Sequence, residues 1–161
     1  MLNNLIYDRT LADVKRFEEL RNKGYSNMTA EEQTEWNAGK MKGAYNVGDL
    51  NRVGAALNYI RDCLALAGYI AADAFTAREN WTLANIPTAA ELSYYINCVE
   101  MIRAAMATYS TTPGTPEQTG GLDYIDANNI EKILFDVDEL ITKMLAVRHF
   151  CGELYCGEDL K

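Results

Sequence analysis

Three residues near the end of the chain have side chains suited to metal binding or nucleophilic chemistry. They are His149, Cys151 and Cys156, in the stretch "RHFCGELYCGEDLK". Zinc sites prefer four ligands in recurrent pairs such as C-x2-C, whereas the spacing here is H-x-C-x4-C with no fourth ligand nearby. His149 is the only histidine of the chain, and no sequence feature favours a thiolate beside it. We therefore expect no metal, no cofactor and no Cys–His nucleophile.

A second cluster of candidate residues is acidic. The stretch "DVDEL" contains Asp136, Asp138 and Glu139 but lacks the glycine and the terminal glutamate spacing of a calcium-binding loop. On a helix we expect these acids to form a solvated face. Because no pair of carboxylates stands out as a general acid and base, the sequence favours a non-enzymatic protein.

Composition limits the classes of partner. With 161 residues, 48% of them hydrophobic, the chain has the size and composition of one globular domain. Its formal charge of −8, with basic residues interspersed among acids, argues against binding to nucleic acid or to an anionic membrane surface. The start "MLNNLIYDRT" has no signal-peptide pattern, and residues 63–72, the longest stretch without charge or strong polarity, are too few to cross a bilayer. We expect a soluble product made in the cytoplasm, no membrane segment and mostly reduced cysteines.

Helical periodicity dominates the rest of the sequence. Capping boxes, apolar stripes and terminal glycines predict helices near residues 10–23, 46–75, 88–108 and 126–148, and a shorter helix after Thr29. Two prolines and three glycines in "STTPGTPEQTGG" predict a loop at about residues 110–121.

The expected fold is all-α and single-domain. Three longer helices with one or two N-terminal helices form a bundle over residues 1–150, and residues 151–161 form a non-helical tail.

The three longer helices share one pattern. Counted from Leu50, Leu92 and Ile130, each has a capping residue four positions earlier and apolar residues at positions 0, +3, +7 and +10. A decayed internal repeat explains this pattern, and so does the general form of a capped amphipathic helix. In "NVGDLNRVGAALNYI" the pattern buries the apolar residues and turns Asn51 and Arg52 outward. We expect both to be solvated, with Arg52 also a candidate partner contact.

Four stretches together resemble one protein family. They are "YDRTLADVKRFEEL", "NMTAEEQTEWNAGKMKGAYNVGDLNRVGAALNYI", "NWTLANIPTAAELSYYINCVEMIRA" and "LDYIDANNIEKILFDVDELI". The family is encoded by phages and prophages of Gram-positive gut bacteria, in the tail and baseplate region of the genome. Its most specific element here is "KGAYN…DLNRV", although the family form usually has Glu where this chain has Gly54. The closing "FCGELYCGE" is similar to the family's "YSGE"-type ending.

The resemblance covers nearly the whole chain and implies a function without catalytic residues. It implies a non-enzymatic structural protein of the virion, associated with the tail or baseplate. Such a protein works by self-association, as a homo-oligomer, or by docking on other virion proteins. The alternative is a small soluble phage protein that binds and modulates a host protein. The ten tyrosines and two tryptophans fit either core packing or an interface.

The end of the chain supplies the remaining candidate partner contacts, which are Phe150, Leu154 and Tyr155. The unit Phe/Tyr-Cys-Gly-Glu occurs twice, and its odd spacing places Phe150 and Tyr155 on opposite faces of an extended segment. One bundle surface cannot easily bury both rings. We therefore expect the segment from about Cys151 to leave the bundle and dock on a neighbour, the alternative being an arm folded back on its own domain.

Overall fold

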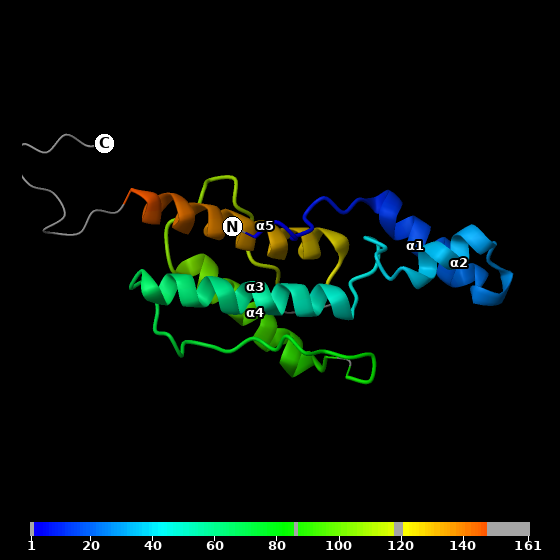
Figure 1. Ribbon diagram of the computed structural model, residues 1–161, viewed down its shortest axis with the longest axis horizontal. Helices are drawn as coiled ribbons and strands as arrows, with labels where there is room; N and C mark the ends of the chain where they lie inside the picture. The colour runs from blue at the N-terminus through cyan, green and yellow to red at the C-terminus, as the bar shows by residue number, and fades with distance from the viewer. Residues whose placement is uncertain (1, 86, 118–120, 148–161) are drawn as a thin grey trace, which may run out of the picture.

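The computed structural model describes residues 2–85, 87–117 and 121–147, and its regular elements are all helices. In chain order they are α1 (Leu11–Lys23), the 3-10 turn η1 (Tyr25–Asn27), α2 (Ala30–Asn37), α3 (Val47–Leu66), α4 (Ala89–Ala104) and α5 (Tyr124–Ala146). Helices α3, α4 and α5 pack on one another as the bundle, while α1 and α2 project from one end of it (Figure 1). The predicted all-α bundle with N-terminal helices is confirmed. We call residues 11–45 the N-terminal lobe.

Each helix begins at a capping box. The capping side chain accepts a hydrogen bond from a backbone N–H of the first turn. The side chain of the third helical residue accepts one from the backbone N–H of the capping residue. The predicted caps Thr10, Thr29, Asn46 and Thr88 are confirmed. The predicted start of the last helix is wrong, because Asp123 is the cap and Asp126 is the third helical residue.

The predicted helix over residues 46–75 is too long. Helix α3 ends at Leu66, and Gly68 follows with a φ of 82°. The N–H of Gly68 donates to the carbonyl of Ala65, and the N–H of Tyr69 donates to that of Leu64. This is a Schellman motif, whose left-handed position glycine occupies without steric cost. In the expected loop, residues 110–117 and 121 are non-helical, as predicted.

The three bundle helices run in the same direction (Figure 1). Near their starts, Arg52 of α3 pairs with Glu131 of α5, and near their ends Tyr69 contacts Met144. Because α3 has 20 residues and α4 has 16, and a helix rises about 1.5 Å per residue, the chain must return over about 30 Å after α3 and about 24 Å after α4 before the next parallel helix begins. Residues 67–88 and 105–123, which we call the first and second crossovers, make these returns.

The core lies between the apolar faces of the three helices. Burying each large side chain there stabilises the fold by about 1.5–3 kcal/mol. The first crossover adds two aromatic rings, Phe75 and Trp81, to this core. The fully buried members from the helices are Val53, Leu57, Ile60, Leu64, Val99, Ile102, Ile130, Ile133, Leu134 and Val137.

A further extended segment, residues 2–10, lies along α5, and we call it the N-terminal arm. It runs antiparallel to the helix, since Leu2 N–H donates to Asp138 (2.6 Å) and Ile6 N–H donates to Glu131 (2.6 Å). The arm therefore covers one outer face of α5, as the first crossover covers one face of α3.

Three helical asparagines hold these extended segments. Each asparagine amide both donates to the carbonyl and accepts from the N–H of one residue, at 2.6–3.0 Å. No strand is present in the described residues to pair with these backbone groups, so the asparagine side chains take that role. The pairs are Asn51 with Trp81, Asn58 with Ala77 and Asn128 with Arg9.

Aligned on their caps, two of the three helices share a further contact. Arg61 of α3 and Arg103 of α4 occupy equivalent positions, and each donates to a carbonyl of the crossover that follows its helix. The equivalent position in α5 is Asp138. In α5 the register lies three residues earlier than predicted, with Ala127 in the place assigned to Ile130. The aligned inward positions are 50, 53, 57 and 60 in α3, 92, 95, 99 and 102 in α4, and 127, 130, 134 and 137 in α5.

Candidate functional site

Most of the candidate residues from the end of the chain lie outside the described residues. These are the candidate contacts Phe150, Leu154 and Tyr155, the tail from Cys151 onward, and the potential ligands His149, Cys151 and Cys156. Within residues 2–85, 87–117 and 121–147, no group of three or more His, Cys, Asp or Glu side chains is placed to hold a metal ion.

The prediction that Asn51 and Arg52 face solvent is wrong. The side chain of Arg52 is 16% exposed and donates to Asp49 (2.6 Å) and Glu131 (2.7 Å). Asn51 is bound to the backbone of Trp81. Both side chains are covered because irregular segments pack on the outer face of α3, an arrangement that helical periodicity does not reveal.

Arg52 belongs to a buried charge cluster formed by Arg9, Asp49, Arg52 and Glu131. Arg9 Nη2 lies 3.1 Å from Asp49 and 2.7 Å from Glu131, so each guanidinium contacts both carboxylates. Burial alone would lower the pKa of Arg52, but its hydrogen bond to Glu131 and the charges of Glu131 and Asp49 together raise it above its usual value. The cluster contains two charges of each sign. It links the arm, α3 and α5 at the end of the bundle next to the N-terminal lobe.

The expected solvated face at Asp136 and Asp138 is also wrong. Both carboxylates are buried: Asp136 accepts a hydrogen bond from Thr112 (2.7 Å) of the second crossover, and Asp138 accepts from the N–H of Leu2 (2.6 Å). Glu139 is the most exposed of the three. Asp136 and Asp138 therefore hold the second crossover and the arm on α5.

A buried tyrosine pair completes the polar framework. The hydroxyl groups of Tyr45 and Tyr95 are hydrogen-bonded to each other, which joins the segment before α3 to α4. Burial raises the pKa of both phenols above the usual value for tyrosine. The guanidinium of Arg9 lies 5.5 Å from the ring centre of Tyr45, so the pair adjoins the charge cluster.

The N-terminal lobe has different internal contacts. The rings of Phe17 and Trp36 stack with centres 5.5 Å apart and planes 5° apart. All of residues 11–45 are described, and Leu20 and Met28 are their buried side chains. Ion pairs near the surface also link α1 to α2: Arg16 with Glu35 (2.7 Å), Lys23 with Glu32 (2.6 Å) and Arg16 with Glu32 (3.9 Å).

An apolar groove of about 410 Å³ lies where the lobe meets the bundle, and we call it the junction groove. Leu83 of the first crossover is 88% exposed at this groove. Its other apolar walls are Phe17, Trp36, Met41, Ala44 and Val47.

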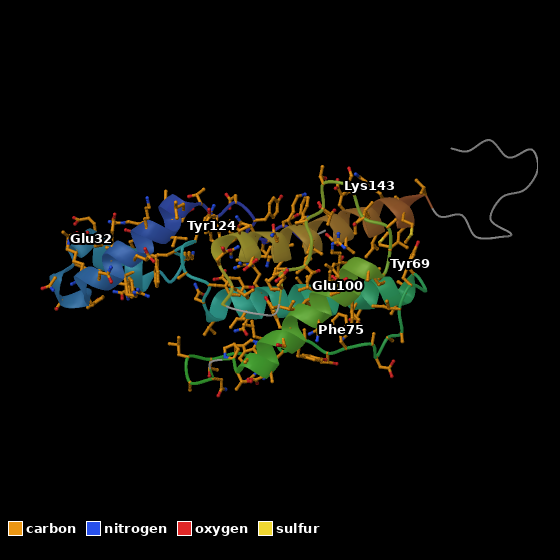
Figure 2. All side chains as sticks on the ribbon, turned by 180° about the vertical axis from the view of Figure 1, so that it is seen from behind. Glu32, Tyr69, Phe75, Glu100, Tyr124 and Lys143 are labelled. Atoms are coloured by element: carbon orange, nitrogen blue, oxygen red, sulfur yellow. The ribbon has the colours of Figure 1, made fainter. Side chains whose placement is uncertain are left out.

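A second exposed apolar surface lies at the opposite end of the bundle. Figure 2 shows Tyr69 and Lys143 at that end and Glu32 on the lobe. Leu66 is 79% exposed and Val147 is 71% exposed there.

The asparagines and buried acids of α3 and α5 were missed in the sequence, although one signal for them exists. Asparagine is unfavourable inside a helix because its side chain competes for backbone hydrogen bonds. Asn51 and Asn58 both lie inside α3 and, seven residues apart, share one face of it. Such a pair beside a long irregular connection indicates a segment bound along the helix.

No helix in the described part of the chain is long and apolar enough to cross a membrane. Comparison with models of protein families, with curated proteins and with solved structures finds no match to this chain.

Proposed function

We propose that this protein is a non-enzymatic structural component of a phage virion, associated with the tail or baseplate, that binds other virion proteins and copies of itself. The observation that carries the proposal is the junction groove, with aromatic walls and a leucine 88% exposed. Exposed apolar surfaces of this kind are typical of protein–protein interfaces. The resemblance of "KGAYN…DLNRV" to the phage family provides the virion context.

The polar framework of the bundle supports a scaffolding role. The charge cluster and the three asparagines bind extended segments to helices at several separate points. The bonds of Asn51 to Trp81 fix the crossover next to Leu83, so the bundle side of the junction groove binds a partner with less loss of conformational entropy. Virion assemblies are symmetric and use one such surface many times.

The end of the chain is the second proposed contact. Helix α5 ends next to exposed Val147, and residues Phe150, Leu154 and Tyr155 follow shortly after it in the sequence. Deletion of residues 151–161 should leave the thermal midpoint nearly unchanged and reduce incorporation into particles or oligomers. A truncated protein that unfolds many degrees earlier would show that the segment belongs to the core.

A pair of charge substitutions tests the junction groove. Leu83→Glu places a carboxylate in the groove at an exposed position, so folding should be unaffected while self-association or binding to tail proteins falls. Met101→Glu is the control, because Met101 is an exposed apolar residue of α4 that lines neither the junction groove nor the end of the bundle near Val147. Light scattering measures self-association of both variants, and co-purification measures their binding to tail proteins. Equal binding by Leu83→Glu and the unchanged protein would contradict the assignment of the groove.

Mass spectrometry of purified particles tests the virion role itself. The proposal requires the protein to be present in particles in stoichiometric amounts with other tail proteins. Its absence from particles, together with presence in the lysate of infected cells, would favour the alternative of a protein directed at a host target.

A further inference from the structure

The segment that follows α5 in the sequence combines apolar and acidic residues. Residues 150–160 contain Phe150, Leu154 and Tyr155 together with three carboxylates, and they contain no basic residue. The carboxylates are those of Glu153, Glu158 and Asp159. A partner surface for this segment therefore needs both apolar walls and positive charge.

The lobe side of the junction groove supplies the positive charge. Lys40 and Lys42 flank Met41, which lines the groove, and no described residue in the groove lining is acidic. Lys40 is exposed and has no ion-pair partner in the described part of the chain, while Lys42 pairs with Asp8 (2.6 Å) in a solvent-accessible pair. An acidic segment in the groove thus meets at least one lysine whose charge is uncompensated.

The groove has two apolar walls from different parts of the chain. Phe17 and Trp36 belong to the lobe, and Leu83 belongs to the first crossover. Neighbouring side chains of an extended segment point to opposite faces. An extended segment in the groove therefore brings Leu154 against one wall and Tyr155 against the other, whereas on a flat surface it leaves one of the two exposed.

The position of the segment makes the groove of a second copy the accessible one. Helix α5 ends away from the lobe (Figure 1), with Val147 beside Ala67 just after α3. Val47 of the groove lies at the start of α3, so its 20 helical residues separate the two sites by about 30 Å. Tyr155 follows Val147 by eight residues, and even a fully straight chain carries it about 29 Å at most. Tyr155 therefore does not enter the groove of its own copy.

We propose that residues 150–159 of one copy bind, as an extended chain, in the junction groove of the next copy. Leu154 and Tyr155 contact the two walls, and the carboxylates lie toward Lys40 and Lys42. Alternating side chains of a bound extended peptide provide its specificity. Because the segment and the groove are different surfaces at opposite ends of the molecule, the contact is head-to-tail and joins copies into a ring or a filament. The inference rests on the proposed function, since it names the two surfaces through which copies of this protein associate.

Mixing two full-length variants tests the head-to-tail contact. Tyr155→Ser removes the ring and leaves the groove intact, whereas Leu83→Glu blocks the groove and leaves the segment intact. Each variant alone should self-associate roughly tenfold more weakly than the unchanged protein in sedimentation velocity, while an equimolar mixture should form a dimer and nothing larger. The proposal is overturned if the unchanged protein does not self-associate, if Tyr155→Ser associates as strongly as the unchanged protein, or if the mixture gains no dimer.

The same variants distinguish other occupants of the groove. Two grooves that face each other would give an association that Leu83→Glu abolishes and Tyr155→Ser leaves unchanged. A tail protein alone would give a co-purification that Leu83→Glu abolishes, with no self-association of the unchanged protein. Either result rejects this inference. The second result, like detection of the protein in purified particles, leaves the proposed virion role in place.

A synthetic peptide of residues 148–161, titrated into full-length Tyr155→Ser, tests the charge complementarity. The indole N–H signal of Trp36 in ¹H–¹⁵N NMR spectra should show a saturable shift, while the amide of Tyr69 at the opposite end of the bundle should not. A matched peptide with Glu153→Gln, Glu158→Gln and Asp159→Asn should bind roughly three- to tenfold more weakly, and about 1 M salt should remove the difference. No saturable shift at Trp36, or equal binding by the two peptides at low salt, would overturn the proposal.

Discussion

The N-terminal lobe and the bundle use the same capping boxes to begin their helices, but different contacts hold their helices together. The lobe relies on one aromatic stack, two buried apolar side chains and ion pairs near the surface. The bundle has an extensive apolar core and a framework of buried acids, arginines and asparagines. The comparison shows that a cap determines where a helix starts, whereas its stability depends on what covers its faces.

The two regions also treat their charges differently. In the lobe, Arg16 and Glu35 pair with their side chains about 40% exposed, so water and salt screen the interaction. In the bundle, the Glu131 side chain is fully buried between two arginines and the N–H of Ile6. Removal of one partner should therefore have a large effect in the bundle and a small one in the lobe.

Glu131→Ala has the largest expected effect. It leaves Arg9 and Arg52 facing one remaining carboxylate in a buried site, and we expect a loss of about 3–5 kcal/mol in the free energy of unfolding. Urea denaturation followed by circular dichroism measures it. Glu35→Ala, which removes an acid from the exposed pair with Arg16, is the control and should change stability far less. Similar losses in the two variants would show that the buried charges of the bundle contribute no more to stability than the exposed pair of the lobe.

Gly54→Ala comes second. Alanine is the better helix former by up to about 1 kcal/mol, so a solvated site would gain stability. At Gly54 the added Cβ would lie 2.2 Å from the Arg78 carbonyl oxygen, and displacement of the crossover should give a net loss of about 1–3 kcal/mol. Gly114→Ala is the control, since a Cβ there meets nothing within 4 Å. A gain in the thermal midpoint of Gly54→Ala would contradict the close packing of the crossover on α3.

The sequence predicted where most helices begin, because capping boxes and apolar stripes are local signals. It did not predict that Asn51 and Arg52 are partly covered or that Asp136 and Asp138 are buried. The segments that cover these four residues are the arm and the crossovers, which have no periodicity and are distant in the chain. The need for glycine at position 54 was not predicted for the same reason, since the segment that requires a glycine there lies beyond the end of that helix.

A smaller effect is expected at alkaline pH. Burial raises the pKa of Tyr45 and Tyr95 in the folded protein, so the unfolded chain releases these protons first. Their contribution to stability is complete below the unfolded pKa near 10 and is lost as the pH rises above it, by about 1 kcal/mol per tyrosine at pH 11. Urea midpoints between pH 9 and pH 11 should fall less steeply in the Tyr45→Phe, Tyr95→Phe double variant. If the urea midpoint of the double variant falls with pH as steeply as that of the unchanged protein, groups other than Tyr45 and Tyr95 cause the loss of stability at alkaline pH.

Native-state hydrogen exchange tests the difference between the two regions most directly. Amides of α1 and α2 should exchange through an opening that requires less free energy than global unfolding, and 1 M salt should lower it further. Amides of α3 and α5 should exchange only on global unfolding. The amides of Ile6 and Ala77 should also be strongly protected although neither residue lies in a helix, because they donate hydrogen bonds to Glu131 and Asn58. Equal opening free energies in α1 and α5, or unprotected amides at Ile6 and Ala77, would contradict this account.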